Sequence, residues 1–173
     1  MEALIEFGKI IIPATLVLYA VYLTVRTFIL KEIELKRLEV RSRSIETTLP
    51  ARLQAYERMT LFLERIAPQN LLIRLNNPGF SARDFHKVVL DEIRNEYNHN
   101  VSQQVYMGED VWSQIRNAKE DLVIVVNEAA STLAPEATSM DLSKKIFEMV
   151  MEKKVDLISY ALTELKKEIQ QTF

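Results

Sequence analysis

The sequence predicts an all-α protein, with a single N-terminal transmembrane helix followed by a cytoplasmic helical bundle of about four helices. Three observations lead to this prediction. Residues 10–25 contain no charged residue, and basic residues crowd the segment that follows them. The chain has only three glycines in 173 residues. Its apolar residues recur at helical spacing and do not alternate as they do in strands.

The uncharged run has the composition of a membrane span. As a helix, residues 10–25 cover about 24 Å, against a hydrocarbon layer about 30 Å thick. Lys9 and Arg26 bracket the run, and both can extend their charged ends to the headgroups. Apolar residues on either side lengthen the span, and Pro13 is tolerated in a membrane helix. We expect a membrane anchor over residues 1–30, with the span at about residues 8–30.

Three alternatives compete with a membrane span. A cleaved signal peptide has a basic start and small residues at its cleavage site. The first residues of this chain include the acidic Glu2 and Glu6, and the best candidate cleavage site has the large Leu18 at position −3. An amphipathic helix lying in the membrane plane needs a polar face, which residues 10–25 lack. A buried helix of a soluble protein is the main alternative, because the run is shorter than about 18 residues.

The basic residues around the span predict its orientation. Lys9 alone precedes the span. Six basic residues follow it closely: Arg26, Lys31, Lys36, Arg37, Arg41 and Arg43. Lysine and arginine accumulate on the cytoplasmic side, so we expect a single-pass inner-membrane protein with its N-terminus outside and its C-terminal domain in the cytoplasm. The absence of cysteine agrees with a reducing compartment.

A juxtamembrane stalk helix is expected over residues 31–48. Leu35, Leu38, Ser42, Ile45 and Leu49 are spaced by 3, 4, 3 and 4 positions, which is the a and d spacing of a coiled coil. The stripe covers barely two heptads. Pairing with a second copy and a solvated stalk with a narrow packing stripe therefore both stay open.

A helical bundle domain is expected over residues 49–173. Thr48 as an N-cap and Pro50 in the first turn predict a break and a new helix over residues 50–66. Pro68 ends that helix, a short helical turn follows at residues 71–75, and residues 76–79 form a turn.

Helix-capping motifs divide the rest of the domain. Ser81 with Asp84 starts a helix that ends near Gly108, and Asp110 caps the next helix. Thr138 and Asp141 cap a last helix that is expected to run almost to Phe173. We expect Trp112 to be a packing anchor, and Met149 and Met151 to fill the core.

Charge and motifs exclude several functions. The chain carries 22 basic and 24 acidic residues, a net charge of −2, which argues against nucleic-acid binding. No cysteine nucleophile, serine-hydrolase motif or glycine-rich phosphate loop is present. We therefore predict no catalytic residue, no cofactor, no metal and no enzymatic activity.

Glu96 and His99 form the strongest catalytic candidate. An E-x-x-H motif on a helix is half of a di-iron carboxylate site. The second histidine, His86, has Arg83 three residues before it, so one chain lacks the other half. A surface histidine paired with Glu96 or Glu92 is the simpler interpretation.

Amide side chains crowd residues 95–104, and this stretch predicts a polar recognition face. The face consists of Glu96, His99, Asn100, Gln103 and Gln104. The alternative is a helix end that frays before Gly108. Three arginines on the preceding helix, Arg52, Arg58 and Arg65, are expected to be solvated and balanced by Glu57 and Glu64.

Several segments resemble a known family. They are residues 49–58 (LPARLQAYER), 63–66 (LERI) and 99–106 (HNVSQQVY), then Trp112 and residues 118–120 (AKE). Together they resemble an uncharacterised family of small bacterial membrane-anchored helical proteins with no assigned function. The resemblance covers most of the chain, anchor included. It implies a bacterial origin and a one-span helical protein, and it transfers no activity, cofactor or partner.

The sequence thus predicts a membrane-tethered cytoplasmic interaction or scaffold module without catalytic activity. Its expected partners are the lipid bilayer and an unknown membrane or cytoplasmic protein, with a second copy of the chain as a further candidate. One alternative is a small structural subunit of a membrane protein complex, which needs an unbroken helix after the span and is disfavoured by Pro50. The other is a metal-dependent enzyme that uses Glu96 and His99.

Overall fold

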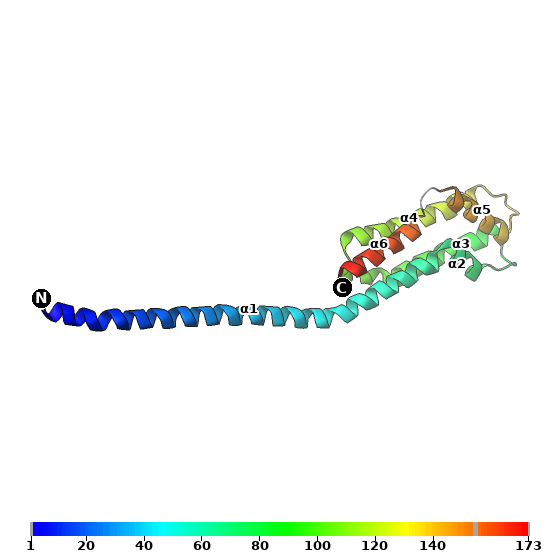
Figure 1. The fold of residues 1–173 in the computed structure, drawn as a ribbon. Coiled ribbons are helices and arrows are strands. Elements are labelled where there is room, and N and C mark those ends of the chain that lie inside the picture. Colours follow the sequence, from blue (N-terminus) through cyan, green and yellow to red (C-terminus); the bar gives the residue numbers. More distant parts are fainter. Residues whose placement is uncertain (1, 154–155, 173) are drawn as a thin grey trace. The chain divides into compact units, whose positions relative to one another are not determined.

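The computed structural model describes residues 2–153 and 156–172, and these ranges are helical without a strand. Figure 1 shows the elements in order: α1 (Glu2–Ile66), α2 (Pro68–Leu75), α3 (Ala82–Asn100), the 3-10 helix η1 (Val101–Tyr106), α4 (Glu109–Ser131), α5 (Ser139–Glu152) and α6 (Leu157–Thr172). An isolated bridge joins Ser81 to Thr138. The prediction of an all-helical chain is confirmed. The chain divides into two compact units, Met1–Leu49 and Pro50–Phe173.

Helix α1 continues through Pro50, so the predicted break at this position is wrong. A helix N-cap accepts a hydrogen bond from a later backbone N–H. Instead, the Thr48 hydroxyl donates to the Ile45 carbonyl at 3.4 Å, and the Thr47 hydroxyl donates to the Arg43 carbonyl at 2.9 Å. Both hydroxyls bond back into the preceding turn, so the helix reaches Pro50 without a cap. The proline removes one backbone donor and does not end the helix.

The first unit consists of the N-terminal part of α1. This helix is long and apolar enough to cross a membrane, and none of its most apolar stretch is buried. The side chains described between residues 11 and 48 are all exposed. The buried core helix, which was the main alternative from the sequence, does not fit this exposure.

The threonine hydroxyl groups of the apolar stretch are bonded within the helix. Thr15 donates to the Ile11 carbonyl at 2.7 Å, and Thr24 donates to the Ala20 carbonyl at 2.8 Å. Hydrocarbon offers no partner for a polar group. These internal bonds therefore suit a helix whose surroundings are apolar.

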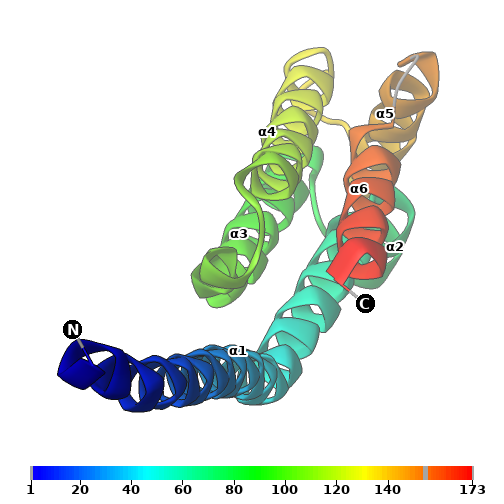
Figure 2. The same cartoon turned by 60° about the vertical axis from the view of Figure 1, so that its left-hand side comes forward.

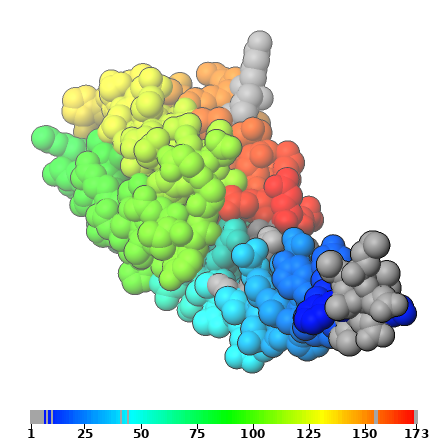
Figure 3. All heavy atoms as spheres, turned by 90° about the vertical axis from the view of Figure 1, so that its left-hand side faces the viewer, coloured from blue at the N-terminus to red at the C-terminus, as the bar shows by residue number. Residues whose placement is uncertain are grey.

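The second unit packs around α4. Helix α4 lies against α3, α5 and α6, and α3 also contacts α2 and α5. Figure 2 shows α4 alongside α3, and Figure 3 shows α6 (red) bordering the start of α4 at the surface. The core takes large side chains from the C-terminal segment of α1 and from the five helices α2 to α6. Its fully buried members include Met59, Phe62, Phe85, Ile93, Ile115, Leu142 and Ile146.

Both predicted capping motifs are present. Ser81 Oγ accepts from the Asp84 backbone N–H at 3.1 Å, and Thr138 with Asp141 forms a reciprocal capping box. The Thr138 hydroxyl and backbone N–H both donate to the Asp141 carboxylate and hold its pKa below the ordinary value. These local bonds fix where α3 and α5 begin.

Removing either cap is expected to destabilise the protein moderately. Ser81→Ala and Thr138→Ala should each lower the free energy of unfolding by about 1 kcal/mol, because a backbone N–H loses its acceptor. Denaturation of the full chain in detergent, followed by circular dichroism, measures the loss. Thr163→Ala is the control, since the Thr163 hydroxyl only donates to the Ser159 carbonyl of its own helix. A loss of the same size in the control would contradict the assignment of the caps.

The boundaries around η1 differ from the prediction. Helix α3 ends at Asn100, and η1 covers the following six residues before Gly108. Helix α4 begins at Glu109 with Gly108 as its N-cap, so Asp110 is not the cap. The Gly108 N–H donates to Glu168, far away in the sequence, and the local motif at Asp110 gave no sign of this contact.

The predicted last helix is two helices. Helix α5 ends at Glu152 and α6 begins at Leu157. Asp156 Oδ1 accepts from the backbone N–H groups of Ile158 at 3.0 Å and Ser159 at 3.2 Å. This aspartate was the missed signal, since apolar residues continue at helical spacing on both sides of it. Met149 packs against the core as expected, whereas Met151 is 84% exposed and does not.

Candidate functional site

A groove between the C-terminal segment of α1 and the end of α3 collects part of the predicted recognition face. Its lining is Gln54, Glu57, Arg58, Leu61, Phe62, Arg65, Glu96, His99 and Asn100. Three of the five predicted residues are therefore in one place. Gln103 and Gln104 belong to η1 and do not line the groove. Helical spacing explains the grouping, because residues three or four apart share one face.

The groove is lined by both apolar and polar side chains. Phe62 is fully buried beneath it, and Leu61 is 54% exposed at its edge. Asn100 is only 6% exposed, and its Nδ2 donates to the Glu96 carbonyl at 2.9 Å. Such a surface suits a peptide segment that carries both apolar and polar side chains.

Arg65, which lines the groove, forms ion pairs with two glutamates of α3. Its Nε lies 2.6 Å from Glu96 Oε1, and its Nη2 lies 3.7 Å from Glu92 Oε1. Arg74 Nη1 also contacts Glu92 Oε1, at 2.5 Å. The network joins α1, α2 and α3. The prediction of a solvated Arg65 balanced by Glu57 and Glu64 is wrong, as is the pairing of a histidine with Glu96 or Glu92, because the partners come from a helix distant in sequence.

The network sets the charge of Glu92 at low pH. The hydrogen bond from Arg74 is the main cause that holds the Glu92 pKa below its ordinary value of 4.5, with further attraction from Arg74 and Arg65. A carboxylate with a lowered folded-state pKa stabilises the fold above its unfolded-state value, and this stability is lost as the pH falls through the folded-state pKa.

Glu92→Gln should therefore reduce the pH dependence of stability. We expect the variant to be less stable than the original chain at neutral pH, and the difference to shrink as the pH falls below 4.5. Thermal unfolding of both proteins from neutral to acidic pH measures this. A difference in melting temperature that stays constant across the range would contradict the role of Glu92.

Two charged residues that line the groove have no ion-pair partner in the part of the chain that the structure describes. They are Glu57 and Arg58, and both are exposed. His99 also lines the groove and is exposed. These groups are available to a binding partner.

The arrangement does not complete a metal site. Among the described residues, no three or more histidine, aspartate or glutamate side chains form a group that could hold a metal ion. Glu96 is bonded to Arg65, and His86 is bonded to Asn127 Oδ1 at 2.9 Å, away from the groove. The second half of the E-x-x-H pattern is not supplied by these residues.

A second groove, between α1 and α2, adjoins the first. It is lined by Leu61, Glu64, Arg65, Gln69, Asn70, Ile73 and Arg74. Leu61 and Arg65 belong to both grooves. Ile73 is 77% exposed. We call the two grooves together the Leu61 surface. The sequence did not predict it, because Ile73 lies in a short helix whose orientation depends on packing.

Comparison with known proteins places the chain in a family. A family model described as a family of unknown function, DUF7935, matches residues 2–172. The chain belongs to this family. The resemblance to an uncharacterised family is thereby confirmed. No curated protein and no solved structure matches the chain. Membership in DUF7935 assigns no ligand or reaction to the Leu61 surface.

Away from these grooves, Glu168 joins three helices of this DUF7935 member. Glu168 Oε1 accepts from the Tyr56 hydroxyl at 2.7 Å and from the Gly108 N–H at 2.9 Å. Arg52 Nη2 donates to the Tyr56 oxygen at 2.8 Å. The expectation that Arg52 is solvated is therefore wrong. A carboxylate at the N-terminus of α4 is favoured by the partial positive charge there, so these contacts are structural.

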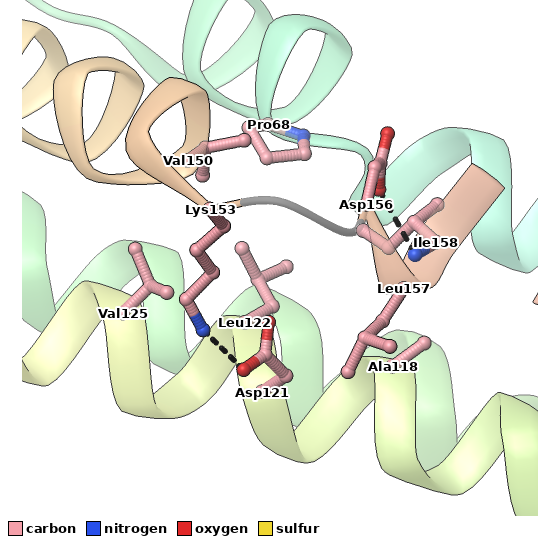
Figure 4. A pocket seen from close by; sticks show the side chains of 10 residues that line it. All are labelled: Pro68, Ala118, Asp121, Leu122, Val125, Val150, Lys153, Asp156, Leu157 and Ile158. Atoms are coloured by element: carbon pink, nitrogen blue, oxygen red, sulfur yellow. Dashed lines mark hydrogen bonds and ion pairs between the residues drawn. The ribbon is translucent and has the colours of Figure 1, made fainter. Parts of the chain in front are cut away.

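A small cavity lies at the junction of α5 and α6. Figure 4 shows Lys153 paired with Asp121 across it, and Asp156 bonded to the Ile158 N–H. Its volume of about 20 Å³ has room for about one water molecule. The cavity is too small for a substrate, and we assign its ion pair to holding the junction against α4.

Proposed function

We propose that the chain is a single-pass inner-membrane protein whose C-terminal helical bundle is a cytoplasmic interaction module without catalytic activity. The observation that carries this proposal is the N-terminal part of α1, which is apolar, exposed and followed by a basic segment. Large exposed apolar areas are costly in water, and lipid removes that cost. The basic residues that follow favour a cytoplasmic C-terminal domain and an N-terminus outside.

The Leu61 surface is the proposed binding site for a protein partner. Leu61 and Ile73 are exposed apolar side chains on adjacent helices, and Arg58 and His99 lie at the edge of the first groove. An apolar centre with polar groups around it is the usual composition of a protein interface. Tethering to the membrane raises the local concentration of the module near membrane partners.

Crosslinking in native membranes followed by affinity purification tests the binding site. Ile73→Asp should abolish recovery of the crosslinked partner. The matched control is Met151→Asp, because Met151 is an exposed apolar side chain on α5, away from the Leu61 surface. Recovery that is unchanged by Ile73→Asp, or lost equally in both variants, would remove the Leu61 surface as the site.

A small structural subunit of a membrane complex is the second candidate. It is favoured by the continuity of α1 through Pro50, since the predicted break had been the argument against it. The same purification separates the two functions. One stoichiometric partner favours the dedicated subunit, and several substoichiometric partners favour the interaction module.

A further inference from the structure

A stripe of uncharged residues runs along α1 beyond the proposed span. It consists of Leu35, Leu38, Ser42, Ile45 and Leu49. Leu35 is 57% exposed, Leu38 is 58% exposed and Ile45 is 51% exposed. The spacing is that of a and d positions in a heptad repeat, which keeps one seam on one side of the helix. The charged residues of this segment all lie off the seam.

The ion pairs of this segment lie beside the seam and not across it. Lys36 contacts Glu32 at 3.7 Å, and Arg43 contacts Glu39 at 2.7 Å, each four residues along the same helix. With Leu35 at a, both glutamates occupy e positions and their basic partners occupy b positions. Two of the charges next to the seam, those of Glu32 and Glu39, are thus balanced within one helix. Glu39 would otherwise repel the g-position Glu34 of a neighbouring copy.

We propose that residues 35–49 form a parallel two-stranded coiled coil with a second copy of this chain. A seam with a and d spacing fits a helix with the same repeat, because side chains of one helix fill the gaps of the other. The membrane anchor of the proposed function, on which the orientation rests, makes two copies parallel and puts identical residues at the same height. The seam then meets itself in register.

Confinement to the membrane explains how so short a seam can pair. Two heptads with Ser42 at one a position offer little contact area. Two anchored copies meet at a far higher effective concentration than free helices, with no further contact required. The pairing is therefore expected in membranes that contain the full chain.

Cysteine crosslinking tests the pairing directly, because the chain has no cysteine of its own. Leu38→Cys and Ile45→Cys place one thiol at d positions. The matched controls are Val40→Cys and Thr47→Cys, at f positions on the opposite side of the helix. A disulfide needs Cβ atoms about 3.5–4.5 Å apart. All four positions are exposed, so a single replacement leaves the helix intact.

Membranes of cells that express each variant are treated with a mild oxidant and resolved on a non-reducing gel. We expect a disulfide-linked dimer fraction several-fold higher at positions 38 and 45 than at positions 40 and 47. Equal crosslinking at all four positions, or none at any, would overturn the coiled coil. Sedimentation of the same samples tests the anchor separately. A preference for the d positions in protein found in the supernatant would preserve the pairing and reject the membrane span.

Discussion

Replacing Phe62 with alanine is expected to lower the free energy of unfolding by about 3–5 kcal/mol. The Phe62 side chain is fully buried. Its ring lies 6.0 Å from the ring of Tyr97, which stacks on Trp112 at 5.9 Å. Truncation removes apolar contacts with both α3 and the core and leaves a cavity that the rigid rings cannot fill.

Denaturation of the full chain in detergent, followed by circular dichroism, measures this loss. The matched control is Leu61→Ala, the adjacent residue on α1, whose side chain is 54% exposed. We expect the control to cost less than about 1 kcal/mol. Equal losses for the two variants would show that the C-terminal segment of α1 does not pack as described. The Leu61→Ala variant also retains the buried Phe62 that lines the first groove.

Glu168→Ala is expected to lower the free energy of unfolding by about 3 kcal/mol, because hydrogen bonds to a charged group are stronger than neutral ones and two donors lose this acceptor. The Tyr56 hydroxyl and the Gly108 N–H both lose the Glu168 carboxylate. Tyr56 is only 1% exposed, so water has little access to its hydroxyl. Helix α4 also loses the negative charge at its N-terminus.

Two controls separate this role from a general effect of the substitution. Glu168→Gln keeps an acceptor oxygen and should lose roughly half as much stability. Glu164→Ala removes a carboxylate of the same helix whose ion pair with Lys167 lies within α6, and it should change stability by less than about 0.5 kcal/mol. A small and equal effect for Glu164→Ala and Glu168→Ala would contradict the joining role of Glu168.

The features that the sequence predicted are those with local causes. The two caps at Ser81 and Thr138 depend on groups three residues apart, so the motif contains its own explanation. The helical content follows from periodicity and from the scarcity of glycine in the same way. The family was likewise predicted from short segments of the sequence.

The features that the sequence missed depend on distant residues or on competition between local signals. Gly108, which precedes α4, donates its N–H to Glu168 of another helix, and no local motif reveals this contact. Arg65 pairs with Glu96 only after α3 has packed beside α1. At Pro50 the helix continues despite a strong stop signal, whereas the weaker signal at Asp156 marks the start of a new helix.

Part of the candidate site was predictable for the same reason. Glu96, His99 and Asn100 are three or four residues apart or adjacent on one helix, and they line one groove. Gln103 and Gln104 were included because the prediction extended α3 past Asn100, where the structure changes to η1. Ile73 and Leu61 line one groove because α2 folds back beside α1, so the apolar part of the Leu61 surface required the fold.

Fractionation of the full-length protein expressed in bacteria tests the membrane anchor most directly. The apolar part of α1 should keep the protein in the membrane pellet after high-speed centrifugation, through washes with high salt and alkaline carbonate. Detergent alone should release it, because a spanning helix is held by hydrocarbon and not by surface charge. Full-length protein in the detergent-free supernatant would contradict the anchor and the proposed function with it.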